Sequence, residues 1–260
     1  MTFRTVGCLD PTSLADGRLG FVSYCEPTNP QSPPTHTIVG LDLRSRRSEV
    51  LAVLGLRPSR VSWNPAVTSG IVSDSSGLCA SVARVTRSGV EHLPVTLEGH
   101  GRRWPVDQDF FADPAGSCDA YGQADMATWS PDGRTIAFFA STDSVGKVGQ
   151  ARIDVTWSLY TMDAAVLRPV IRVRGLINPT GVAWSPDSRQ LAISSRRGPR
   201  RGTRLLDLNG HLNRRVSQES VRDLAWSPDG TRLVAVHEVD PDASPIKSEV
   251  VIFDLAGLAT

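Results

Sequence analysis

Five arginines fall within nine residues of the chain, in the segment Arg196-Arg197-Gly198-Pro199-Arg200-Arg201-Gly202-Thr203-Arg204. A guanidinium group stays charged and presents a planar fork of donors that fits a carboxylate or a phosphate. The segment therefore predicts a binding site for a small anion or for an acidic protein surface, formed by Arg196, Arg197, Arg200 and Arg201. The alternative is a solvated loop whose charge is balanced by the acidic segment 237–242.

Aromatic residues gather in one long segment, 100–122, and offer a second candidate surface. Trp104, Phe110 and Phe111 lie within it, among glycine and proline residues that favour turns. Aromatic side chains of this size are frequent anchors of protein–protein contacts. They predict contact with another protein. The alternative is that they fold the segment back onto its own sheet.

Side chains with the chemistry of catalysis or metal binding are scattered along the chain. The 5 histidines and 4 cysteines follow no metal-ligand spacing, and the sequence contains no Cys-x-x-Cys pair. The motif Gly-x-Ser-x-Gly, which positions the nucleophile of many hydrolases, is also missing. The sequence therefore predicts no catalytic residue, no metal site and no cofactor.

The balance of charge restricts the partners further. Lys and Arg total 28 and Asp and Glu total 27, a net charge of +1, which is unlike the strongly basic domains that bind nucleic acid. No aromatic residue interleaves the arginines of 196–204 to stack on bases. The sequence has no apolar run of about 18 residues for a membrane span, and no signal-like run follows Met1. We expect a cytoplasmic protein that binds another protein or a small anion.

A repeated phrase identifies the elements that position these residues. Each full copy contains Trp-Ser-Pro-Asp between two apolar runs, and the copies occupy 127–138, 182–193 and 224–235. A divergent copy begins at Trp63-Asn64-Pro65, and a fainter one at Ala15-Asp16-Gly17. Sequence repeats of about 40–50 residues are typical of β-propeller blades.

The phrase has a direct physical interpretation as a β-hairpin. Proline presets φ in the turn, glycine tolerates positive φ, and an apolar strand lies on each side. Proline sits where the sheet needs no backbone donor. The tryptophan that ends the first strand is expected to fill the wedge between neighbouring sheets.

Further apolar segments after each hairpin complete four strands per unit. Third strands are expected at 37–43, 78–85, 155–162, 203–208 and 249–255, and fourth strands at 49–53, 91–95, 168–173 and 213–216. These units predict an all-β fold: a single domain forming a five-bladed β-propeller of four-stranded antiparallel blades. The blades are expected at about 8–55, 58–99, 123–175, 177–217 and 219–258, with an insertion at 100–122. The alternative is a short, degenerate sixth blade within 100–122.

Closure of the ring is expected to involve the start of the chain. The last unit has no fourth strand after Leu255, whereas Thr2–Val6 has strand character. Because an open ring would leave edge strands unpaired, we expect this N-terminal strand to pair with 250–255.

The Trp-Ser-Pro-Asp-Gly hairpin followed by a Leu-Asp-Leu strand resembles the repeat of TolB-like, WD-repeat-like β-propellers. The resemblance covers most of the chain and is strongest over 122–260. Its matching residues occupy turn and core positions, so it implies a propeller and leaves the activity open. Some propellers are lactonases or lyases whose ligands come from several blades around the channel.

Such a fold would gather the long segments 25–36, 100–122, 141–154, 195–203 and 238–248 on one face, here called the long-loop face. Residues just before the first strands would line the channel mouth, namely Arg60, Asp125, Asn178, Thr180 and Arg222. They share no residue type that implies a metal or a nucleophile. We therefore expect a non-enzymatic scaffold that binds through the long-loop face. The alternative is a hydrolase or lyase with its site at the channel mouth.

Overall fold

The computed structural model describes residues 8–14, 17–25, 35–54, 60–74, 80–99, 102–107, 123–141, 156–209, 212–240 and 247–256. Every regular element in these ranges is a β-strand, which agrees with the predicted all-β class. The same ranges hold no helix long and apolar enough to cross a membrane. The chain divides into two compact units, unit 1 (Met1–Trp129) and unit 2 (Ser130–Thr260), each with its own apolar core.

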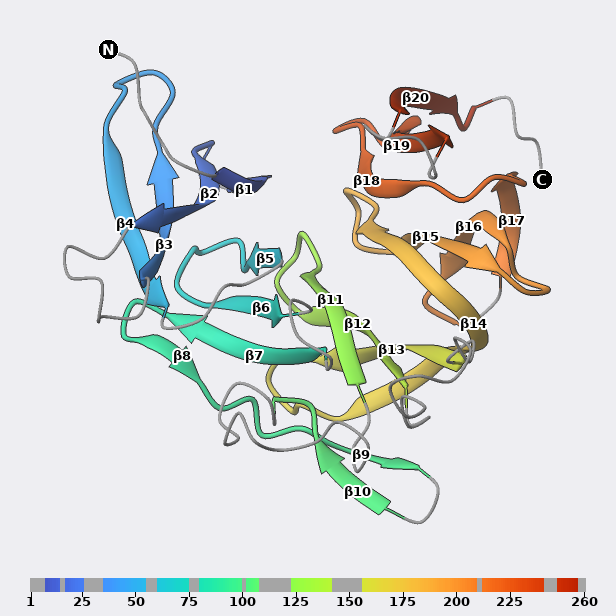
Figure 1. Cartoon of the computed structure of the whole chain (residues 1–260), viewed down its shortest axis with the longest axis horizontal. Helices are drawn as coiled ribbons and strands as arrows, with labels where there is room; N and C mark the ends of the chain where they lie inside the picture. Colours follow the sequence, from blue (N-terminus) through green and yellow to red (C-terminus); the bar gives the residue numbers. More distant parts are fainter. Residues whose placement is uncertain are drawn as a thin grey trace. The chain divides into compact units, whose positions relative to one another are not determined.

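Unit 1 begins with two four-stranded antiparallel sheets in which sequence neighbours are also neighbours in space (Figure 1). The first contains β1 (Cys8–Ser13), β2 (Leu19–Cys25), β3 (Thr35–Leu41) and β4 (Ser48–Leu54). The second contains β5 (Arg60–Trp63), β6 (Gly70–Asp74), β7 (Ser81–Thr86) and β8 (Gly89–Glu91). Both are meanders, the blade topology that the repeats predict.

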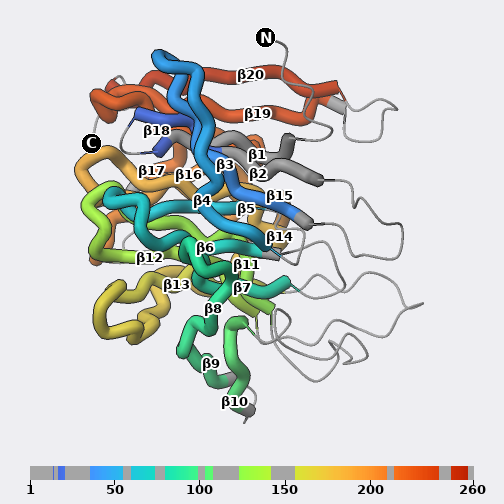
Figure 2. The backbone as a smooth tube through the Cα atoms, turned by 90° about the vertical axis from the view of Figure 1, so that its left-hand side faces the viewer, coloured from blue at the N-terminus to red at the C-terminus, as the bar shows by residue number. Residues whose placement is uncertain are grey.

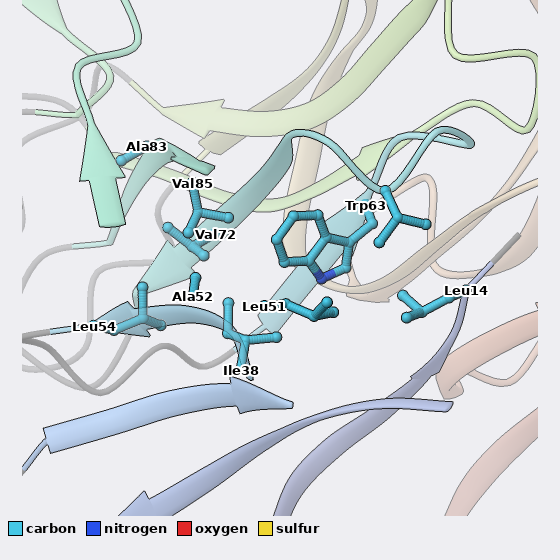
Figure 3. Packing of buried hydrophobic residues seen from close by; sticks show 10 residues of the cluster. Leu14, Ile38, Leu51, Ala52, Leu54, Trp63, Val72, Ala83 and Val85 are labelled. Carbon is cyan, nitrogen blue, oxygen red and sulfur yellow. The ribbon is translucent and has the colours of Figure 1, made fainter. Parts of the chain in front are cut away.

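The core of unit 1 lies between these two sheets (Figure 3). Ile38 and Leu51 from the first sheet and Val72 and Val85 from the second are at most 1% exposed. Trp63, at the end of β5, packs among them and is 9% exposed. The predicted role of this tryptophan as a wedge between sheets is therefore confirmed.

A hairpin follows the second sheet, where the sequence predicts the end of a blade and then a long insertion. β8 ends at Glu91, while β9 (Thr96–Gly99) and β10 (Arg102–Pro105) pair with each other. The fourth strand of the second sheet therefore lies at 89–91 rather than at the predicted 91–95, and the expected insertion begins with β10. The β9–β10 hairpin forms because apolar residues alternate along this segment and face the interior. The buried residues are Leu93, Val95, Leu97, Trp104 and Val106. After it, β11 (Gln123–Trp129) packs beside β5, β6 and β7.

Unit 2 contains β12 (Thr135–Ser141), β13 (Thr156–Asp163), β14 (Pro169–Trp184), β15 (Gln190–Arg197), β16 (Gly202–Asp207) and β17 (Leu212–Ser217). Each pairs antiparallel with the next. A separate sheet holds β18 (Arg222–Trp226), β19 (Arg232–Asp240) and β20 (Lys247–Asp254). In Figure 2, β19 and β20 run side by side along their length.

β14 differs from the sequence prediction because it joins two predicted blades into one continuous sheet. The sequence predicts a fourth strand at 168–173 and a separate first strand ending at Trp184, but one strand of 16 residues covers both. Its first part pairs with β13 and its second part with β15, and the register shifts between Pro179 and Gly181. Asn178, with φ of 51°, lies where the two parts of β14 meet. Sequence propensity does not reveal such continuity, because each half alone reads as an ordinary strand.

Two features of the predicted architecture stay predictions. Thr2–Val6, expected to close the ring, lie outside the described residues. The number of blades and the closure of the ring are therefore not decided by the described strands. Within those strands, β20 has a partner only on its β19 side.

Candidate functional site

The arginine-rich segment forms the connection between β15 and β16, as predicted for a loop between second and third strands. Glycines shape this connection: Gly198 and Gly202 adopt φ of +81° and +99°, values that side chains rarely allow. The Arg201 N–H donates to the Gly198 carbonyl at 3.0 Å, closing a tight turn. A Cβ on Gly202 would lie 2.3 Å from the Ser217 carbonyl oxygen, so the loop is packed closely against the β17–β18 connection.

Glu238 holds one end of the arginine loop. Its Oε2 accepts a hydrogen bond from Arg196 Nη2, and its Oε1 lies 3.3 Å from Arg222 Nη1. Its side chain is only 16% exposed, so solvent screens these pairs less than a fully exposed ion pair. One carboxylate therefore fixes two arginines that come from different sheets of unit 2.

A histidine lies beside this group on the same strand. His237 Nε2 is 3.3 Å from Glu219 Oε2, and His237 Nδ1 is 3.2 Å from Glu249 Oε1. A neutral imidazole donates through one nitrogen only, so both carboxylates receive a hydrogen bond only when the ring is protonated. This arrangement ties β19 and β20 to the β17–β18 connection.

The residues at this end of unit 2 define a surface that we call the loop end, formed by 196–202, 217–223 and 237–238. Among the predicted binding residues, Arg196, Arg197 and Arg201 are exposed there and Arg200 is half-buried. Glu238, Glu219 and His237 were not among the predicted site residues. The acidic character of 237–242 indicated Glu238 as the counter-charge, and that alternative is confirmed for Arg196. The His237 contacts depend on cross-strand register, which the sequence does not reveal.

The predicted channel-mouth residues lie within strands of both units, and Asn178 lies in the middle of β14 rather than before a first strand. Arg60 begins β5 and Asp125 lies in β11, both in unit 1, while Asn178 lies in β14 and Arg222 begins β18, both in unit 2. Asp125 Oδ1 accepts the Met126 N–H at 2.6 Å. Their convergence on a common mouth stays a prediction.

Two of the first strands contain the same backbone irregularity. Met126 and Asp223, each three residues before the tryptophan that ends its strand, have φ of 54° and 53°. Beside Asp223 the register of β18 against β19 shifts. Such bulges bend a strand and re-aim its side chains. Recurrence at equivalent positions assigns this positive φ to the fold.

The aromatic candidates divide between the described and undescribed residues. Trp104 lies in β10 with its side chain 3% exposed, which matches the alternative in which the segment folds back onto unit 1. Phe110 and Phe111 lie outside the described residues. Within the described ranges, no three His, Cys, Asp or Glu side chains are grouped so that they could hold a metal ion.

Comparison with known proteins places the chain among β-propellers. A family model described as "WD domain, G-beta repeat" matches residues 202–238, which run from the start of β16 to Glu238. No curated protein sequence matches the chain. The repeat match and the solved structures therefore indicate a β-propeller fold similar to that of TolB and WD-repeat proteins.

Three solved structures illustrate this likeness. Putative TolB from Agrobacterium tumefaciens is 17% identical with a TM-score of 0.62, over 96% of this chain and 78% of that one. TolB from Acinetobacter baumannii is 18% identical with a TM-score of 0.56, over 92% and 51%. An oligogalacturonate lyase in complex with manganese is 11% identical with a TM-score of 0.57, over 94% and 64%. At such identities the likeness concerns the fold.

Proposed function

We propose that this chain is a non-enzymatic scaffold that binds an acidic protein surface at the loop end of unit 2. The observation that carries the proposal is the pairing of Arg196 with Glu238, which anchors the arginine loop beside Arg222. Arg197 and Arg201 belong to the same segment and are exposed. A loop fixed in this way loses little conformational entropy on binding, so its guanidinium groups are preorganised for carboxylates.

The test measures binding of fluorescein-labelled poly-L-glutamate by anisotropy. The Arg197→Ala/Arg201→Ala variant should bind at least about tenfold more weakly, because two charge-assisted contacts are lost. The matched control is Arg134→Ala/Arg189→Ala, which removes the same charge from exposed positions in the Ser-Pro-Asp turns. Equal weakening in both variants would show non-specific attraction and would overturn the proposal.

We also propose that the complete scaffold is a five-bladed propeller closed by Thr2–Val6. The proposal is supported by β20, whose Val250 and Ile252 are 70% and 62% exposed on the last strand of a three-stranded sheet. An unpaired strand edge is an aggregation hazard that closure removes. Deletion of residues 1–7 should lower the melting temperature, and an unchanged value would contradict closure.

The competing function, a propeller lyase or hydrolase, is tested with the same preparation. One of the structural neighbours is an oligogalacturonate lyase in complex with manganese. The protein is incubated with oligogalacturonate and manganese, and unsaturated products are followed by ultraviolet absorbance. Product formation that scales with protein concentration would overturn the scaffold proposal in favour of a lyase.

A further inference from the structure

Three arginines form a cluster on the outer strands of the sheet that carries the arginine loop. Arg204 in β16 lies directly opposite Arg215 in β17 in the antiparallel register. Side chains in such a pair lie on the same face with their Cβ atoms roughly 5 Å apart. Arg200, in the loop before β16, contributes a third positive charge to Arg204.

The Arg204 side chain is embedded more deeply than a surface arginine. Its neighbours Thr203 and Leu205 are 0% and 5% exposed, while Arg204 is half-buried. The Nε of Arg204 is shielded from solvent and has no hydrogen-bond acceptor among the described residues. Burial, and then the charges of Arg215 and Arg200, lower the pKa of this guanidinium.

Counter-charges do not balance the cluster within the described part of the chain. No ion pair there involves Arg200, Arg204 or Arg215, although the neighbouring Arg196 and Arg222 both share Glu238. Like charges placed opposite each other on paired strands destabilise a sheet. The arrangement therefore costs stability unless an anion joins it.

We propose that Arg200, Arg204 and Arg215 bind the phosphate group of a ligand. A phosphate monoester carries a charge between about −1.5 and −2 and three acceptor oxygens, so it matches several guanidinium groups better than one carboxylate does. Arg215 is exposed and Arg200 is half-buried, so the cluster is accessible from the solvent side. This site goes beyond the proposed acidic partner, because it takes a chemically different ligand at residues other than Arg197 and Arg201.

The first experiment compares thermal unfolding in sodium phosphate and sodium chloride at equal pH and ionic strength. Phosphate should raise the melting temperature of the wild-type protein, because a ligand that binds only the folded state stabilises it. The Arg215→Gln variant should lose most of this rise. In chloride alone the same variant should melt at or above the wild-type temperature, because one repulsive charge has gone. A merely structural role for Arg215 would lower the melting temperature in both salts and would overturn the proposal.

Arg214→Gln is the matched control on the same strand. Arg214 Nη2 donates to the Leu255 carbonyl at 3.4 Å, so its side chain is engaged elsewhere. Calorimetric titration with inorganic phosphate should show affinity reduced at least about tenfold in Arg215→Gln and unchanged in Arg214→Gln. Equal losses in both variants, or a wild-type protein that binds no phosphate, would refute the site.

Further titrations distinguish the source of the phosphate. Inorganic phosphate, glycerol 3-phosphate and a phosphoserine peptide share the recognised group, and the tightest of the three identifies the ligand class. Arg215-dependent binding of poly-L-glutamate without any phosphate binding would assign the cluster to carboxylates and overturn the proposal. The Arg197→Ala/Arg201→Ala variant should retain the phosphate response, so failure of the acidic-partner proposal is distinguishable from failure of this one.

Discussion

The two ends of strand β15 differ in how their structure is specified. At one end lies the Ser185-Pro186-Asp187 turn. We call this turn and the equivalent turns at 130–134 and 227–231 the turn end, because the same contacts recur in all three. Ser185 Oγ donates to Asp187 Oδ1 at 2.6 Å and accepts the Gln190 N–H at 2.9 Å. The corresponding bonds of the other two turns have the same distances.

The fourth residue of each turn explains the glycine in the repeat. Gly133, Ser188 and Gly230 have φ of 71°, 60° and 72°, and each donates its N–H to the serine carbonyl at 2.9 Å. Val67 takes this position in the divergent copy with φ of 53°. There the side chain of Asn64 accepts the Thr68 N–H at 2.9 Å and so replaces the serine–aspartate pair. The turn is thus encoded within six residues.

The loop end, at the other end of β15, has no such repetition. Its geometry depends on contacts between residues distant in sequence, such as Arg196 with Glu238 and Gly202 with Ser217. Contacts that recur in every copy stabilise the fold, whereas residues that differ between copies can be specific for one partner. The comparison therefore directs a search for function to the loop end.

The largest effect is expected from Gly202→Ala, which breaks the loop end alone. The new Cβ would lie 2.3 Å from the Ser217 oxygen at φ of +99°, so unfolding free energy should fall by about 3 kcal/mol or more. Gly175→Ala is the control, since φ is +71° there and nothing lies within 4 Å of the new atom. It should cost only about 1 kcal/mol. Urea denaturation measures both, and equal losses would contradict the close packing of the loop.

A smaller loss is expected from Ser194→Ala, which weakens the junction beneath the loop end. The buried Ser194 Oγ accepts the Val221 N–H at 2.9 Å. Without it, this buried N–H loses its acceptor, at a cost of about 1–3 kcal/mol. Ser248→Ala, at an exposed position of β20, should change stability by less than about 0.5 kcal/mol. If Ser194→Ala lowers the free energy of unfolding by no more than Ser248→Ala does, water replaces the Ser194 hydroxyl as the acceptor for the Val221 N–H.

Glu238→Gln tests the loop end by removing the charge of this side chain while keeping its shape. The variant leaves Arg196 and Arg222 without their shared carboxylate, and we expect a loss of about 1 kcal/mol at low salt. High salt should reduce the difference because it screens the charges. Glu98→Gln, from an exposed pair with Arg103, should have almost no effect. A salt-independent difference would argue against an electrostatic role for Glu238.

The smallest change is expected from Asp229→Ala, which perturbs the turn end. The Ser227 hydroxyl, followed by the Thr231 backbone and side chain, lowers the pKa of Asp229 from 3.8 to about 2. Because the folded state favours the ionised carboxylate, its stabilising effect is complete above pH about 4 and disappears as pH falls through about 2. The difference between the melting temperatures of wild type and variant should therefore shrink as pH falls through about 2. A constant difference at all pH values would contradict this linkage.

The sequence predicts those features that are determined locally. The Ser-Pro-Asp turns, most strand positions and the wedge role of Trp63 follow from residue type and periodicity. The sequence does not predict the β9–β10 hairpin, because the glycines at 99 and 101 interrupt its alternating apolar pattern. At the loop end, the arginines and the acidic segment were evident from composition. The partners of His237 and the opposition of Arg204 to Arg215 depend on strand register, which no local pattern specifies.

The shared strand β14 has a consequence for how unit 2 comes apart. Since one continuous strand supplies hydrogen bonds to β13 along its first part and to β15 along its second, fraying that starts on either side is transmitted across Asn178. Forced extension should therefore release β12–β17 in one cooperative event rather than one predicted blade at a time. For the same reason, a recombination breakpoint that exchanges whole repeats is poorly tolerated within 169–184, whereas a break in an external turn leaves every ladder intact.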